Sequence, residues 1–292
     1  MYKAIPIVLV LTLFGAACSA SPPAPISPTE TASPPPPTRT LLPPTTTPMP
    51  PTPTATPSGE PGLIDVGGYS LFMICEGEGN PAVVIDAGQL DTIAEWRAVL
   101  TGIAEFTRVC YYDRAGVGAS ESGPTPRTSQ TIVDELHTLV VNAGISTPLI
   151  LVGASFGGFT SLLFADQYPD LVAGLVLVDS EHPRQRERLA SYLLPSWVWV
   201  PFEGVDWEES AAQVEATGSL GNLPLTVLSA SLHGFLPGGE GVWSDMQEEL
   251  ANKSTAGTQV VVEMSGHHIN MDIPTAVVDA VQLMVDDVRA SE

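Results

Sequence analysis

Seven short apolar runs separated by helix-like stretches constrain the fold of this chain more than any other feature. The runs cover residues 69–75, 82–86, 107–112, 149–153, 175–179, 225–230 and 259–264. Apolar residues also recur at helical spacing, at Ile132, Val133, Leu136, Leu139 and Val140 and again at Val277, Val281, Met284, Val285 and Val288. Strands that are apolar throughout and alternate with helices indicate a mostly parallel sheet buried on both faces. We therefore expect an α/β fold with its functional residues just after the carboxyl ends of the strands.

The strongest chemical signal follows the run at 149–153, in the sequence Gly153-Ala154-Ser155-Phe156-Gly157-Gly158. A tight turn from a strand into a helix leaves no room for side chains two positions on either side of its central residue, which accounts for the glycines around the serine. Such a turn presents the serine hydroxyl at a helix N-terminus, where negative charge is stabilised. Ser155 is the candidate nucleophile.

With this turn and two further segments, the chain resembles the α/β-hydrolases from about residue 62 to residue 292. The further segments are 112–120, with the sequence YDRAGVGAS, and 174–179, with the sequence GLVLVD. The resemblance implies a mostly parallel eight-stranded sheet flanked by helices, with a small cap at about residues 181–223. It also implies a serine hydrolase that needs no cofactor and no metal. Haloalkane dehalogenases and epoxide hydrolases of this fold use an aspartate nucleophile, so Ser155 argues against both.

A serine hydroxyl needs a neighbouring imidazole to accept its proton. The family places this histidine after the last strand, where the chain reads Ser265-Gly266-His267-His268. We expect His267 to be the base and keep His268 as the alternative. A metal site is disfavoured because neighbouring side chains on a loop diverge and no cysteine or carboxylate cluster completes a shell. Surface positions or ordinary polar contacts are expected for the other histidines, His137, His182 and His233.

The third member of a triad orients the imidazole and stabilises its charged form. Most relatives carry it after the strand that corresponds to 225–230, but residues 229–234 read SASLHG and offer no carboxylate. Some relatives use the end of the preceding strand, which is Asp179 here. We therefore expect Asp179 to be the acid. Three other carboxylates remain open as alternatives: Glu181, Glu240 and Asp245.

Two backbone N–H groups are needed to stabilise a tetrahedral oxyanion. The resemblance assigns one to Phe156, after the nucleophile, and the other to Gln89, in the loop that follows 82–86. Relatives commonly have a histidine where this chain has Ala87. The donors are main-chain groups, so this difference leaves the expectation intact.

The cap segment and the cysteines carry further expectations. Residues 181–223 are rich in aromatic side chains, namely Tyr192, Trp197, Trp199, Phe202 and Trp207. They either line a pocket for the hydrophobic part of a small-molecule substrate or pack the cap onto the core. In the strand order of the family, Cys75 and Cys110 lie on neighbouring strands, so we expect a disulfide between them, with buried free thiols as the alternative.

The first 61 residues differ in composition from the rest of the chain. An apolar run ends in Gly15-Ala16-Ala17-Cys18, which predicts an export signal over residues 1–18 and resembles a lipobox with Cys18 as the lipidated residue, although Gly15 stands where leucine is usual. Residues 19–61 hold 16 of the 28 prolines and 15 serines or threonines. This segment predicts a disordered linker. We expect an exported protein held on the extracellular face of a membrane by its lipid alone, or a secreted or periplasmic one.

Charge and site together define the expected function. The net charge of −22 excludes nucleic acid as a partner, because phosphate binding needs a basic surface. We expect a serine hydrolase that cleaves an ester-type bond, like a carboxylesterase, through an acyl-enzyme. The alternatives are an amide or thioester hydrolase and a non-catalytic binding protein on the same fold.

Overall fold

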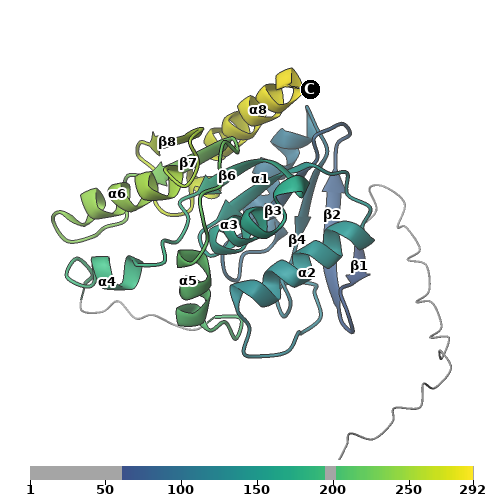
Figure 1. The fold of residues 1–292 in the computed structure, drawn as a ribbon, viewed down its shortest axis with the longest axis horizontal. Helices are drawn as coiled ribbons and strands as arrows, with labels where there is room; N and C mark the ends of the chain where they lie inside the picture. The colour runs from purple at the N-terminus through teal and green to yellow at the C-terminus, as the bar shows by residue number, and fades with distance from the viewer. Residues whose placement is uncertain (1–60, 195–201, 292) are drawn as a thin grey trace, which may run out of the picture. The chain divides into compact units, whose positions relative to one another are not determined.

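The computed structural model describes residues 61–194 and 202–291, in which one eight-stranded sheet is the central layer (Figure 1). Its strands lie in the order β1-β2-β4-β3-β5-β6-β7-β8. The first two pairings, β1 with β2 and β2 with β4, are antiparallel, and all the others are parallel. The strand bounds are Gly62–Asp65 (β1), Ser70–Glu76 (β2), Val83–Asp86 (β3), Val109–Tyr112 (β4), Leu149–Ala154 (β5), Val172–Val178 (β6), Leu225–Ala230 (β7) and Gly257–Val262 (β8).

The central strands are apolar throughout because both of their faces are covered. Successive residues of β5 alternate between two hydrophobic cores: Leu149 and Leu151 belong to one, and Ile150 and Val152 to the other. A one-sided sheet would expose every second residue, whereas every residue of β5 is buried. The expected mostly parallel α/β sheet is confirmed.

Helices cover the two faces of the sheet in separate groups (Figure 1). One core receives apolar residues of α1 (Ile93–Ala104), α7 (Ile269–Asp272) and α8 (Pro274–Ser291). The other receives residues of α2 (Ser129–Asn142), α3 (Gly157–Gln167), α5 (Trp207–Glu215) and α6 (Gly239–Ala251). A short 3₁₀ turn, η1 (Pro169–Leu171), precedes β6, and α4 (Gln185–Leu189) packs on α6. Both cores pack against the central strands, whose carboxyl ends carry the site.

The antiparallel edge of the sheet departs from the expected elements. Strand β1 was not among the seven predicted runs, because its four residues alternate between half-buried and exposed and carry little apolar signal. It pairs with β2, and β2 in turn pairs with β4. Cys75 lies opposite Cys110 in that second pairing, and the two form a disulfide, as expected. The alternative of free thiols is wrong.

The cap segment lies between β6 and β7 and contains α4 and α5. Main-chain hydrogen bonds join it to the core, since Arg127 N–H donates to Gly204 C=O and Asp206 N–H donates to Arg127 C=O. Trp197 and Trp199, like the predicted signal and most of the predicted linker, lie outside the described residues. Within residues 61–194 and 202–291, no helix combines the length and apolar character needed to cross a membrane.

Candidate active site

Ser155 occupies a strained turn between β5 and α3. Its φ of 48° lies in the left-handed region, which is costly for a residue with a side chain. The flanking glycines are required by close packing: a Cβ on Gly153 would lie 2.6 Å from Ser161 Oγ, and one on Gly157 would lie 2.0 Å from the Asp86 carbonyl oxygen. The close packing that predicts glycines on both sides of Ser155 is therefore present in the structure.

His267 lies in the loop after β8 and contacts the serine. Its Nε2 atom lies 3.0 Å from Ser155 Oγ, and its Nδ1 atom lies 2.7 Å from Asp179 Oδ2. An ionised carboxylate only accepts hydrogen bonds, so Nδ1 carries the proton and Nε2 is free to accept one from the hydroxyl. His268 lines the same pocket but has no hydrogen bond to Ser155 in the described part of the chain. The geometry thus favours His267 over His268.

Asp179 follows β6 and is fully buried. Its Oδ1 accepts hydrogen bonds from Ala230 N–H at 2.9 Å and from Trp243 Nε1 at 2.8 Å. Its Oδ2 is shared by His267 and by His233, whose Nε2 lies 2.8 Å away. Four donors therefore converge on this carboxylate from the end of β7, helix α6 and two loops. These hydrogen bonds stabilise the ionised form of Asp179 in the protein interior.

The pKa values of these groups follow from burial and from each other. Burial opposes ionisation of Asp179, but the hydrogen bonds and positive charges of His233 and His267 outweigh it and hold its pKa far below the usual value. Burial lowers the pKa of His267, yet the hydrogen bond and charge of Asp179 prevail and raise it above the usual value. The charge of His233 acts in the opposite direction on His267.

The other candidate acids lie elsewhere. Glu181 is held by Trp207 Nε1, and burial raises the pKa of its carboxyl. Glu240 contacts His233 rather than His267. Asp245 is exposed on α6. Asp179 is the candidate acid that touches the imidazole facing Ser155.

His233 was expected to make ordinary polar contacts and is instead part of this network. It lies in the segment SASLHG after β7, where no carboxylate is available. The sequence offered one signal, its place three residues beyond the end of β7, but that signal does not distinguish a network member from a surface histidine.

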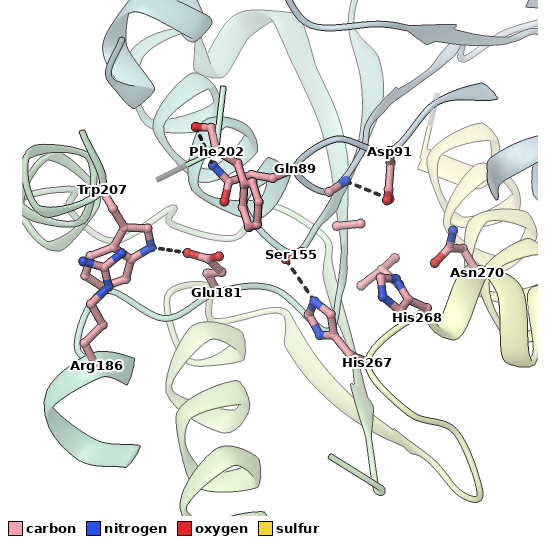
Figure 2. A pocket seen from close by; sticks show the side chains of 13 residues that line it. Gln89, Asp91, Ser155, Glu181, Arg186, Phe202, Trp207, His267, His268 and Asn270 are labelled. Atoms are coloured by element: carbon pink, nitrogen blue, oxygen red, sulfur yellow. Dashed lines mark hydrogen bonds between the residues drawn. The ribbon is translucent and has the colours of Figure 1, made fainter. Parts of the chain in front are cut away.

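The two expected oxyanion donors, Phe156 and Gln89, lie in different segments near Ser155. Phe156 directly precedes α3 as its N-cap residue, and a Cβ on Gly88 would lie 3.5 Å from Ser155 Cβ, so the loop after β3 approaches Ser155 closely. Gly88 N–H is occupied by Asp91 Oδ2 at 3.2 Å. Among the described residues, no acceptor contacts the main-chain N–H groups of Phe156 and Gln89. The Gln89 side chain turns aside, with Nε2 3.4 Å from the Phe202 carbonyl oxygen (Figure 2).

A buried arginine holds in place residues 86–91, which we call the oxyanion loop after the role expected of Gln89. The Arg114 guanidinium donates to the carbonyl oxygens of Ala87 at 2.5 Å and Gly88 at 2.6 Å, and to Asp86 Oδ1 at 2.7 Å. Glu203 in the cap pairs with Arg114 at 2.8 Å and accepts a hydrogen bond from Leu90 N–H at 2.7 Å. The loop is thereby fixed from the core and from the cap. From the sequence, Arg114 was noted only as part of segment 112–120, which resembles the α/β-hydrolases, and Glu203 was not identified.

Two cavities meet at Ser155. The first, of about 260 Å³, is bordered by the oxyanion loop and by polar side chains that include Glu181, Arg186 and Asn270 (Figure 2). The second, of about 310 Å³, lies between α4, α6 and the loop after β7. Its walls are mostly apolar, and their largest side chains are Leu189, Leu193, Leu232, Phe235 and Trp243. The site therefore has a side of mixed polarity and a mostly apolar side.

Among the described aromatic residues of the cap, Trp207 packs on the core, and neither Trp207 nor Phe202 lines the mostly apolar cavity. Trp207 is 7% exposed and its ring centroid lies 5.8 Å from that of Phe159, so it packs the cap onto the core. It also borders the first cavity, as does Phe202.

Asp179, His233 and His267 also offer three ligand atoms within 4.8 Å of one another, a donor set that zinc uses. The contacts fit hydrogen bonding better. Both histidine nitrogens lie 2.7–2.8 Å from the same carboxylate oxygen, and the free nitrogen of His267 faces Ser155. The contacts of these side chains therefore describe a hydrogen-bond network and not a metal site.

Comparison with known proteins agrees with this architecture. Residues 72–200 match the family described as the α/β hydrolase fold. The uncharacterized protein YqjL of Bacillus subtilis is 26% identical over 208 residues, which cover 68% of this chain and 81% of that protein. A thermophilic esterase from Thermogutta terrifontis superposes with a TM-score of 0.60 at 21% identity, covering 79% of this chain and 99% of that one. Alpha/beta hydrolase domain-containing protein 10 from mouse superposes with a TM-score of 0.62 at 15% identity, covering 80% and 99%.

These likenesses, together with the sheet order, define the fold. The protein has the α/β-hydrolase fold, as the resemblance of its sequence implied.

Proposed function

We propose that this protein is a serine hydrolase that cleaves esters through an acyl-enzyme. The observation that carries the proposal is the unbroken contact from Ser155 Oγ to His267 Nε2 and from His267 Nδ1 to Asp179 Oδ2, at 3.0 and 2.7 Å. This order of nucleophile, base and acid is an arrangement that supports acyl transfer. The likeness in fold to an esterase is consistent with it.

In the first half of the reaction, Ser155 Oγ attacks the carbonyl carbon while His267 Nε2 takes its proton. The oxyanion that forms accepts hydrogen bonds from the N–H groups of Phe156 and Gln89. The ester C–O bond then breaks, and the departing alcohol oxygen takes the proton from His267. Water repeats the sequence on the acyl-enzyme, giving its proton to His267 and its oxygen to the acid product, and Ser155 regains its hydrogen. Asp179 stays ionised throughout and stabilises the imidazolium.

The substrate is a small ester with one hydrophobic part. The support is the apolar cavity of about 310 Å³ that reaches Ser155 beside a more polar one. A hydrocarbon chain gains about 0.8 kcal/mol for each CH₂ that it buries in such a cavity. The smaller cavity, which is more polar than the first-named one, suits a short or hydrogen-bonding group on the other side of the ester. An amide or thioester fits the same machinery and is a second candidate bond.

Labelling with a fluorophosphonate tests the proposal against a non-catalytic binding protein on the same fold. A fluorophosphonate phosphonylates only an activated serine. We expect stoichiometric labelling of Ser155 in folded protein, none in Ser155→Ala, and labelling slower by orders of magnitude in His267→Ala. An unlabelled wild-type protein with a normal melting curve would instead support the binding protein.

The location of the enzyme is a separate part of the proposal. Export through residues 1–18 and acylation of Cys18 would hold the hydrolase at a membrane surface, with the proline-rich linker as a tether. Expression of the full chain in a bacterium that processes lipoproteins tests this. The wild type should enter the detergent phase in Triton X-114 partitioning, and Cys18→Ser should stay in the aqueous phase. Equal partitioning of both would contradict acylation.

A further inference from the structure

A second imidazole faces the carboxylate that His267 depends on. His233 Nε2 lies 2.8 Å from Asp179 Oδ2, and His233 Nδ1 lies 2.8 Å from Glu240 Oε2. Glu240 also accepts hydrogen bonds at Oε1 from the main-chain N–H groups of His233 at 2.8 Å and Gly234 at 3.1 Å. Helix α6 therefore fixes both the ring and the backbone of this histidine.

The two contacts of His233 determine its charge. A neutral imidazole has one N–H donor and one bare nitrogen, whereas both partners here are carboxylates that only accept hydrogen bonds when ionised. Both contacts are made at once only if the ring carries two protons. Its surroundings hold the ring still: its side chain is 6% exposed, it stacks on Phe235 at 4.9 Å, and it tilts against Trp243 at 5.0 Å.

The balance of burial and charge agrees with this protonation. Burial lowers the pKa of His233, but the hydrogen bonds and charges of Asp179 and Glu240 outweigh it, so the pKa lies above the usual value. The groups facing His233 are Asp179 from the end of β6, Glu240 from α6 and His267 from the loop after β8. The two carboxylates therefore favour the protonated form of the His233 ring.

On the basis of the proposed function, we propose that His233, held by Glu240, is a positioning residue that carries a fixed positive charge. It orients Asp179 Oδ2 toward His267, and because it shares that oxygen it limits how basic His267 becomes. The sequence has no carboxylate directly after β7. His233, which follows β7 and is held by Glu240, instead supports Asp179, the carboxylate after β6. Neither His233 nor Glu240 touches the reacting atoms.

The sign of the effect on His267 follows from the charges around its ring. Asp179 and Glu181 raise its pKa and His233 lowers it, while the ring of His268 lies 5.2 Å away. Loss of the positive charge on His233 removes the lowering contribution, so the pKa of His267 rises. Because only neutral His267 accepts the serine proton, the acidic limb of kcat/KM then moves to higher pH.

Two substitutions separate charge from position. Glu240→Gln leaves His233 neutral, with Nε2–H still donating to Asp179 and Nδ1 now accepting from the new amide. We expect the midpoint of the acidic limb to move up by about 1 pH unit, with the plateau of kcat within about 3-fold of wild type.

His233→Ala should move the midpoint in the same direction and also lower the plateau of kcat by about 10-fold, because Asp179 loses a donor that orients it. Asp245→Asn is the matched control: it removes one exposed charge from the same helix and should leave both quantities unchanged.

A measurement without substrate keeps the proposal independent of activity. The chain has five histidines, so ¹⁵N-histidine signals can be assigned with single His→Gln variants. Both ring nitrogens of His233 should be protonated across the pH range in which His267 titrates, and Glu240→Gln should make one of them lose its proton.

A neutral His233 in the wild type, or a midpoint that Glu240→Gln leaves in place or moves to lower pH, would overturn the proposal. Absence of fluorophosphonate labelling on Ser155 would instead overturn the proposed function. That outcome is distinct, because it leaves the ¹⁵N readout of His233 standing.

Discussion

Trp243 Nε1 donates a hydrogen bond of 2.8 Å to Asp179 Oδ1, so a residue of α6 fixes the carboxylate that follows β6. The contact is buried on both sides. It explains how Asp179, the proposed acid at the end of β6, is aimed at the imidazole after β8. The orientation comes from neighbouring elements rather than from the strand that carries the residue.

Asp179→Asn should abolish most of the catalysis. The amide keeps the shape of the carboxylate but cannot stabilise the imidazolium, and it favours the wrong tautomer of His267. We expect kcat to fall by about 10³–10⁴-fold with little change in KM. Steady-state kinetics on a nitrophenyl ester measure this. Glu181→Gln and Asp245→Asn are comparison variants, and a larger loss in either one would transfer the role of acid to it.

The pH profile of the wild type should show one ionisation on its acidic side. Asp179 stays ionised because its pKa is held far below the usual value, and His267 has a raised pKa. Activity needs neutral His267, so kcat/KM should fall as the pH drops through a midpoint above about 6.5, the ordinary value for histidine. Two acidic ionisations, or a midpoint near that of a free carboxyl group, would contradict the assignment of the base.

Glu203→Gln should lower kcat by about 10-fold and change KM little. The amide oxygen can still accept from Leu90 N–H, but the ion pair that holds Arg114 against the oxyanion loop is lost. Loss of one oxyanion donor costs about 10²–10³-fold, and a displaced loop should cost part of that. Glu215→Gln, at an exposed position of α5, is the control. A change confined to KM would place Glu203 in substrate binding instead.

Filling the apolar cavity should change chain-length preference. Leu193 lines that cavity, whereas its neighbour Leu194 does not and is 48% exposed. Leu193→Trp should lower kcat/KM for an octanoyl ester by about 10-fold and for an acetyl ester by less than about 2-fold, since the larger side chain takes the space of about two CH₂ groups of the longer chain. Leu194→Trp should alter neither. Parallel series of acyl and alkyl chains show which side of the ester enters the cavity, and equal losses on all chain lengths would refute this use of it.

Removal of the disulfide should destabilise the fold without touching the site. Cys75 and Cys110 close a loop of 35 residues between neighbouring strands. The loss of this constraint on the unfolded chain corresponds to about 3–4 kcal/mol. The double substitution to serine should therefore lower the melting temperature while kcat at 25 °C stays unchanged. An unchanged melting temperature would be the contrary result.

The parts of the site that lie on strand ends were predictable from sequence. Ser155 is marked by glycines that the packing demands, and His267 and Asp179 follow apolar runs whose ends meet at one edge of a parallel sheet. Apolar continuity likewise predicted most strands, because central strands are buried on both faces. Each of these features has a local cause that the sequence records.

The supporting residues had no such local signal. Glu203 lies 89 positions from Arg114, and His233 lies 54 positions from Asp179, so their contacts depend on how the cap and α6 pack. Strand β1 escaped prediction because an exposed edge strand needs few apolar residues. Glu203, His233 and β1 all depend on contacts that form only in the tertiary structure.

Isolation of the acyl-enzyme tests the central claim most directly. Rapid mixing of the wild type with a nitrophenyl ester should release a burst of one equivalent of nitrophenolate per chain, because acylation precedes the slower attack by water. Intact mass spectrometry after acid quenching should find one acyl group, located by peptide mapping on Ser155 and missing in Ser155→Ala. Turnover without a burst, and with no acyl group on Ser155, would contradict the account.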